Sequence, residues 1–113
     1  MSDPRLALQV DDHHGVTVLR LNGELDLGTG ETFMRACAQL LVRDQVKIVV
    51  DVSGLGFCDC SGLSALIAEQ REAERRGGYL RLLGVHGPLA RLLTLAELLE
   101  AFPPYTDLRQ ACG

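Results

Sequence analysis

The chain has 113 residues, of which 47% are hydrophobic and 23% charged, and its formal net charge is −4 at pH 7. This length predicts one domain over residues 1–113, and the composition is typical of a globular protein. The acidic balance argues against nucleic-acid binding, which needs clustered Lys and Arg to neutralise phosphates. No apolar run approaches the ~20 residues that cross a bilayer, and the polar N-terminus is unlike a signal peptide. We therefore expect a cytoplasmic protein with no membrane partner.

The first elements are two short β-prone segments, residues 6–10 and 16–21. Turn-forming residues separate them and predict a β-hairpin. In the second segment Val16 and Val18 share one face and Leu19 lies on the other, so both faces are apolar. That pattern is typical of a strand inside its sheet.

A glycine-containing loop, residues 22–30, leads into a helix that we expect Thr29 to cap. One apolar stripe recurs at i, i+3, i+4, i+7 and i+8 of this helix: Phe33, Ala36, Cys37, Leu40 and Leu41. The stripe predicts an amphipathic helix packed on a sheet. Residues 46–52 are nearly continuous in β-branched side chains, which predicts a central strand covered on both faces.

A second amphipathic helix is expected after residues 53–61 and before Gly77 and Gly78, which end it. Its apolar residues are Leu63, Leu66, Ile67 and Ala73, and its expected solvent face carries Glu69, Arg71, Glu72, Glu74 and Arg75. Residues 79–83 predict a further strand, and a third helix follows Pro88.

The last part of the chain contains Pro103 and Pro104, which limit residues 102–105 to an edge strand because proline donates no backbone hydrogen bond. Thr106 is then expected to cap a short terminal helix. The resulting order predicts an α/β domain: an N-terminal β-hairpin, then alternating units, with a mixed, mostly parallel sheet of four to five strands and four helices.

Right-handed crossovers make strands two, three and four parallel, so the loops at their carboxyl ends converge on one edge of the sheet. These loops are residues 22–30, 53–61 and 84–88. In open α/β sheets this edge binds ligands and partners. The middle loop therefore places Asp59 and Ser61 at the expected functional edge.

The segment Cys58-Asp59-Cys60-Ser61 has side chains that could bind a metal, act as a redox sensor or act as a nucleophile. With His86 it holds potential metal ligands, but structural zinc sites use paired C-x2–4-C motifs, and here there is one close Cys pair. We expect no metal and no other cofactor. A redox sensor built on the two thiols is a weaker alternative, because a Cys-x-Cys disulfide is strained, although a helix end can lower a thiol pKa.

Catalysis by Ser61 would require a base. His13 and His14 fall in the hairpin turn at the opposite edge, which leaves His86 as the candidate. The sequence has neither a G-x-S-x-G elbow around Ser61 nor a glycine-rich phosphate-binding motif. We therefore expect a protein that is not an enzyme.

By residue type, Ser61 is expected to be the N-cap of the second helix, with Asp59 a solvated turn residue. The same position suits a phosphate, because N–H groups and the helix dipole attract anions there. Phosphorylation would add about −1.5 to −2 charges to an edge that already holds Glu24, Asp26 and Asp59, and would repel a partner docked on it.

Residues 49–63 resemble the signature of STAS-domain anti-sigma factor antagonists, in which an apolar strand ends in Asp, here Asp51, and a Phe-x-Asp-Ser/Thr-Ser/Thr-Gly-Leu turn opens a helix. Residues 23–26, Gly-Glu-Leu-Asp, resemble an earlier motif of that family. Length and element order agree with its single-domain members over essentially the whole chain. Cys60 departs from the family's usual Ser or Thr, and the Pro pair shortens the last strand.

The resemblance implies a regulator that works by partner switching. The unphosphorylated form would bind an anti-sigma factor that is also a serine kinase with a GHKL-type ATP-binding fold, which releases a sigma factor. The kinase would phosphorylate Ser61 and so abolish binding, and a PPM-type phosphatase would reverse this. The implied partner-binding residues are Glu24, Asp26, Asp59, Cys60, Ser61 and Gly62. The alternative is a STAS-like scaffold or accessory module of a signalling or transport assembly that is not switched.

Overall fold

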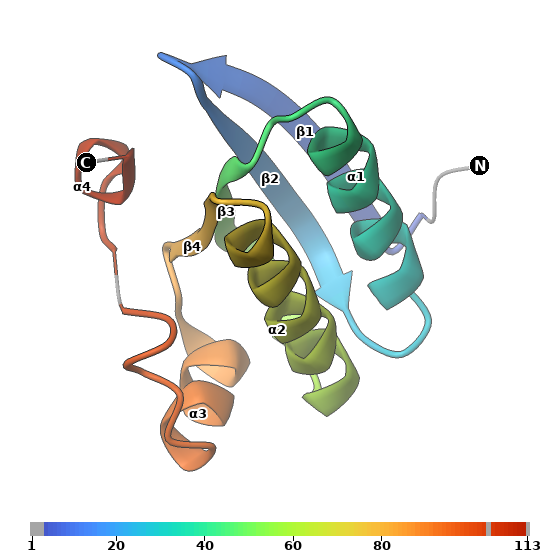
Figure 1. The fold of residues 1–113 in the computed structure, drawn as a ribbon. Coiled ribbons are helices and arrows are strands. Elements are labelled where there is room, and N and C mark those ends of the chain that lie inside the picture. The colour runs from blue at the N-terminus through green and yellow to red at the C-terminus, as the bar shows by residue number, and fades with distance from the viewer. Residues whose placement is uncertain (1–3, 104, 113) are drawn as a thin grey trace.

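In the computed structural model, residues 4–103 and 105–112 are described. Over these ranges the chain forms four strands and four helices in the order β1 (Leu6–His13), β2 (Val16–Leu25), α1 (Gly30–Val42), β3 (Lys47–Cys58), α2 (Cys60–Arg75), β4 (Tyr79–Leu83), α3 (Gly87–Leu95) and α4 (Leu108–Cys112). The strands make one sheet, with α1, α2 and α3 over one face and α4 over the other (Figure 1). The predicted α/β fold, with its hairpin and alternating units, is confirmed.

The sheet has the order β1-β2-β3-β4, with β1 antiparallel to β2 and the remaining pairs parallel. The central strands are covered on both faces. Ile48 and Val50 pack under α1, α2 and α3, whereas Val49 faces a smaller cluster that includes Val18 and Ala111 of α4. Two apolar layers explain why the sequence of β3 is nearly continuous in branched side chains.

Strands β2 and β3 extend further than the sequence predicts. We expected them to end near residues 21 and 52, but they remain paired to Leu25 and Cys58, with register shifts on either side of Gly23. Gly23 has φ +119°, and a Cβ built on it would lie 2.1 Å from the carbonyl oxygen of Arg5. Glycine permits such irregular pairing, but in a sequence it indicates a loop. The strand ends were therefore predicted too early.

Helix α2 lies between α1 and α3 (Figure 1), and this corrects one prediction about its faces. Glu69 was expected on the solvent face of α2, but it is only 7% exposed. Gln70 is also buried, and its side chain donates to the carbonyl oxygen of Ala101 at 2.6 Å. A helix flanked on two sides buries a wider arc than its apolar stripe indicates.

The predicted edge strand at residues 102–105 is reduced to one bridge, between Leu83 and Tyr105. Pro104, which belongs to that prediction, lies outside the described residues, as do residues 1–3 and 113. The helix that follows is capped by Asp107 rather than by Thr106, since Oδ1 of Asp107 accepts from the N–H of Gln110 at 2.8 Å.

Helix α4 is fixed to the sheet by Arg81. The guanidinium lies 3.8 Å from the ring centroid of Tyr79 and 5.7 Å from that of Tyr105, and it donates to the carbonyl oxygen of Ala111 at 2.9 Å. The cation–π contacts of Arg81 and its hydrogen bond to the helix therefore hold α4 against the sheet together. Within the described residues, none of the helices has both the length and the apolar character to cross a bilayer.

Candidate functional site

The ends of β2 and β3 meet where α1 and α2 begin. Leu25 pairs in register with Cys58, and the N–H of Asp59 donates to the carbonyl oxygen of Leu25 at 3.3 Å. The predicted convergence of these two loops is therefore confirmed. The third loop lies beside β3, where Nε2 of His86 is 3.0 Å from the carbonyl oxygen of Ser53.

Helix α2 begins one residue after Asp59. Oδ1 of Asp59 accepts from the N–H of Gly62 at 2.9 Å, and its backbone carbonyl accepts from the N–H of Leu63 at 3.0 Å. Asp59 is the N-cap, so the predictions that Ser61 caps the helix and that Asp59 is a solvated turn residue are wrong. The backbone hydrogen bond from Asp59 to Leu25 holds Asp59 in an extended conformation. The helix therefore starts at Cys60, with Ser61 in its first turn.

Gly62 allows α2 to pack closely against the end of β2. A Cβ built on Gly62 would lie 2.3 Å from the carbonyl oxygen of Leu25 and 3.0 Å from Sγ of Cys58. The contact with the carbonyl oxygen is shorter than side-chain carbons adopt, so a larger residue would displace the helix. Gly62 is itself buried, and it shapes the site by positioning Ser61 and Cys60 next to the β2 end.

The loop from β2 to α1 is held by Asp26. Oδ1 of Asp26 accepts from the N–H groups of Gly28 at 2.9 Å and Thr29 at 3.2 Å. Thr29 is at the N-cap position, as predicted, but its hydroxyl donates to the carbonyl oxygen of Glu24 at 2.9 Å instead of accepting from the helix. Nη1 of Arg5 lies 3.6 Å from Oδ2 of Asp26. These contacts fix the loop and hold the Asp26 carboxylate near the surface.

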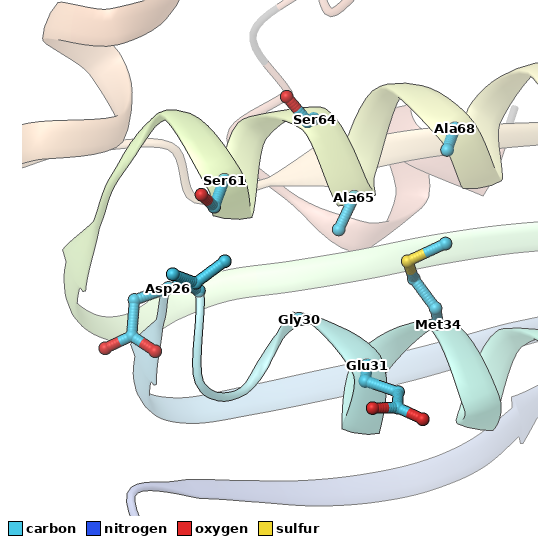
Figure 2. A pocket seen from close by; sticks show the side chains of 9 residues that line it. Asp26, Gly30, Glu31, Met34, Ser61, Ser64, Ala65 and Ala68 are labelled. Atoms are coloured by element: carbon cyan, nitrogen blue, oxygen red, sulfur yellow. The ribbon is translucent and has the colours of Figure 1, made fainter.

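Ser61 is half-buried and lies on the wall of an open groove of about 370 Å³ between α1 and α2 (Figure 2). The carboxylate oxygens of Asp26 point away from Ser61 in this view. The polar lining is Asp26, Glu31, Ser61 and Ser64, and the apolar lining includes Leu27, Met34, Ala65 and Ala68. The phosphoacceptor expected from the sequence is therefore part of a concave surface.

The residues expected to bind a partner lie along this one edge. Glu24 and Cys60 are exposed, and Asp26, Asp59 and Ser61 are half-buried. Phe57, which is 44% exposed and pairs in register with Glu24, was not among the residues expected from the sequence to bind a partner. The groove residues Leu27 and Met34 were not among them either. An apolar Leu27 within a glycine-containing loop was the one available signal.

The two thiols of the segment differ in their surroundings. Cys58 is 3% exposed, and burial, together with the carboxylate of Asp59, raises its pKa to about 12. Cys60 is exposed. A thiol with so high a pKa is a poor nucleophile, which weighs against the redox alternative. In the described part of the chain there is no cluster of three His, Cys, Asp or Glu side chains suited to hold a metal.

Comparisons with known proteins agree with this geometry. The model of the STAS domain family matches residues 7–111. An anti-sigma F factor antagonist of Paenibacillus polymyxa is 31% identical over 103 residues, covering 90% of this chain and 88% of that protein. The chain belongs to the STAS-domain anti-sigma factor antagonist family.

Solved structures share this STAS fold. The crystal structure of an anti-sigma factor antagonist from Mycobacterium paratuberculosis has a TM-score of 0.82 and 28% identity, and the match covers 98% of this chain and 95% of that one. A sulfate transporter family protein from Wolinella succinogenes has a TM-score of 0.73 at 21% identity, with 90% and 85% coverage, which shows the fold alone.

Proposed function

We propose that this STAS domain is a phosphorylation-controlled anti-sigma factor antagonist. Its unphosphorylated form binds an anti-sigma factor that is also a serine kinase with a GHKL-type ATP-binding fold, so that a sigma factor is released. The kinase phosphorylates Ser61, which ends binding, and a PPM-type phosphatase restores the active form. The exchange takes place in the cytoplasm, and the domain itself performs no catalysis.

The observation that carries the proposal is the position of Ser61 in the first turn of α2, on the wall of the groove. N–H groups of a first turn have no intrahelical acceptor, so a phosphate on Ser61 would meet donors and the positive end of the helix dipole. The fold tolerates the modification for this reason. The surface nevertheless changes greatly, because about −1.5 to −2 charges are added beside Asp26 and Asp59.

The proposed docking surface consists of Glu24, Asp26, Asp59, Cys60, Ser61 and Gly62. Its members do not all act alike. Glu24 and Cys60 are exposed and available for contact, whereas Asp59 and Gly62 are used to start α2 and to seat it against Leu25. We therefore assign direct contact to Glu24, Cys60 and Ser61, and a supporting role to Asp59, Gly62 and Asp26, which holds the loop before α1.

A STAS scaffold or accessory module that binds without being switched is the second candidate. The fold does not separate the two, because the sulfate transporter family protein has it too. The position of Ser61 on the groove wall, in the first turn of α2, favours the switched protein, since an unswitched scaffold does not need a phosphoacceptor there.

The decisive experiment uses purified GHKL-type anti-sigma kinases from the organism that supplies the gene. Each kinase is incubated with the protein and ATP, phosphate is located by mass spectrometry, and complex formation is measured with ADP before and after phosphorylation. We expect phosphate on Ser61, binding of the unmodified form, and loss of binding afterwards. Phosphate on a different residue, or a complex indifferent to ATP, would contradict the switch. The Ser61→Ala variant should bind and stay bound when ATP is added.

A further inference from the structure

The groove between α1 and α2 extends away from Ser61 and has an exposed apolar surface. Leu27 is 82% exposed and Met34 is 38% exposed, although both are large apolar side chains. Ala65 and Ala68 of α2 line the groove with them (Figure 2). Apolar side chains gathered at a concave surface are typical of sites that bind a partner.

The α2 wall of the groove has a regular spacing. Ser61, Ser64, Ala65 and Ala68 are related by i, i+3, i+4 and i+7, so they lie on one helix face and extend over two turns, roughly 10 Å at 1.5 Å per residue. Their short side chains leave the hollow between α1 and α2. A partner helix that enters a groove presents apolar anchors at the same i, i+3, i+4 and i+7 spacing.

The α1 side of the groove carries two carboxylates. Asp26 and Glu31 line it. The Asp26 side chain is 15% exposed and engaged within its loop, whereas that of Glu31 is 84% exposed and pairs with Arg35 at the surface. The exposed carboxylate of Glu31 complements Lys or Arg on a docking partner, because a surface ion pair such as the one with Arg35 is weak.

We infer that this groove receives an amphipathic helix of the anti-sigma partner, with an apolar side chain between Leu27, Met34 and Ala65 and with Lys or Arg next to Glu31. The inference rests on the proposed function and specifies its partner. It also explains how phosphate on Ser61 acts. The α2 wall is covered by the apolar face of the partner helix, and a phosphate there would be stripped of water beneath it, which is unfavourable even though the α1 side attracts cations.

The first test measures binding to the purified kinase that phosphorylates Ser61, held with ADP so that Ser61 stays unmodified. We expect Leu27→Ser to weaken binding by about tenfold or more, as truncation of a central apolar anchor does. The matched control is Leu95→Ser, because Leu95 is 81% exposed on α3 and does not line the groove. The control should bind as the wild type does, and both variants should unfold at the wild-type temperature.

The second test observes the groove directly by NMR. The chain has two methionines, so a protein labelled with 13C at the methionine methyl groups gives a simple spectrum, and Met34→Leu assigns the signal of Met34. We expect this signal to shift when the kinase is added and to stay unchanged when the protein alone is concentrated.

The outcomes separate the inference from the function on which it rests. If wild type, Leu27→Ser and Leu95→Ser all bind equally while Ser61 phosphorylation still abolishes binding, the groove assignment is wrong and the proposed function stands. A Met34 signal that shifts with protein concentration alone would mean that a second copy occupies the groove, and would overturn the assignment. If no kinase binds or phosphorylates the wild type, both proposals fail.

Discussion

Asp59 and Gly62 are joined by a hydrogen bond of 2.9 Å from the Gly62 N–H to the Asp59 carboxylate, and this bond begins the helix that carries Ser61. The backbone of Asp59 is tied in turn to Leu25, and Gly62 is too close to Leu25 to carry a side chain. The two residues that flank Cys60 and Ser61 therefore hold them in place, and each can be tested apart from the switch.

The first prediction concerns the cap. Asp59→Ala should lower the free energy of unfolding by about 1 kcal/mol, because the N–H of Gly62 loses its acceptor. Asp59→Asn keeps an acceptor oxygen and should stay near the wild type. Urea denaturation measures both. An Ala variant as stable as the Asn variant would show that the side chain does not cap α2 in solution.

The second prediction concerns close packing. Gly62→Ala should cost about 1–3 kcal/mol, since its new carbon would overlap the carbonyl oxygen of Leu25. Gly56→Ala is the control, because the nearest atom to its built Cβ is the carbonyl oxygen of Gly23 at 4.0 Å. Chemical denaturation of the two variants should separate them clearly. Equal stability would mean that α2 shifts at little cost.

The third prediction separates charge from folding. Ser61→Asp should leave the free energy of unfolding within about 1 kcal/mol of the wild type, because the helix dipole offsets repulsion from Asp26 and Asp59. The same variant should bind the anti-sigma kinase weakly. Ser64→Asp, one turn further into α2, tests whether the effect depends on position. A strongly destabilised Ser61→Asp would mean that loss of binding reports unfolding rather than switching.

The fourth prediction concerns Glu69, which is buried. Burial raises the pKa of its carboxyl, and the carboxylate of Glu72 on the same helix raises it further. The thiol of Cys37 on α1 is a further neighbour of this carboxyl. A carboxyl with a raised folded-state pKa stabilises the fold at low pH and loses that contribution as pH rises through the raised value. Glu69→Gln should therefore gain stability relative to the wild type as pH rises above the ordinary Glu pKa of about 4.3.

The measurement for Glu69 is the free energy of unfolding of wild type and variant at several pH values around and above that pKa. Glu74→Gln, at an exposed position of the same helix, is the matched control for the removal of one carboxylate from α2. A difference for Glu69→Gln that does not grow with pH would show that the carboxyl is solvated.

The fifth prediction concerns thiol reactivity. With a pKa of about 12 and 3% exposure, Cys58 should resist alkylation by iodoacetamide at pH 8, while exposed Cys60 is labelled first. Peptide mass spectrometry over a time course measures the two rates. Equal labelling in the folded protein would revive the redox alternative.

Much of the fold could be predicted from periodicity, because hydrophobic patterns report on faces and order. The parallel strands and the loops at their ends were expected on that basis. The extensions of β2 and β3 were not predicted. Gly23 pairs with Leu55 and Gly54 pairs with Asn22 next to shifts in the strand register, and glycines in such positions resemble loop residues in the sequence.

The sheet edge that carries the candidate site could be predicted, but its local geometry could not. Asp59 and Ser61 are both good N-cap residues two positions apart, and the choice between them was made by a tertiary contact to Leu25. Similarly, Glu69 is buried because α2 has a neighbour on each side. The groove depends on how α1 and α2 lie side by side, and periodicity within one helix carries no information about that.

Helix α4 has a consequence for how the protein opens. Its five residues are too few to remain helical alone, so the helix persists only while Ala111 packs on Val18 and Val49 and Arg81 holds its carbonyl. We expect the amide protons of α4 to exchange with solvent through local detachment, well before those of β3 exchange through global unfolding. We therefore expect α4 to detach while the edge that carries Ser61 stays intact.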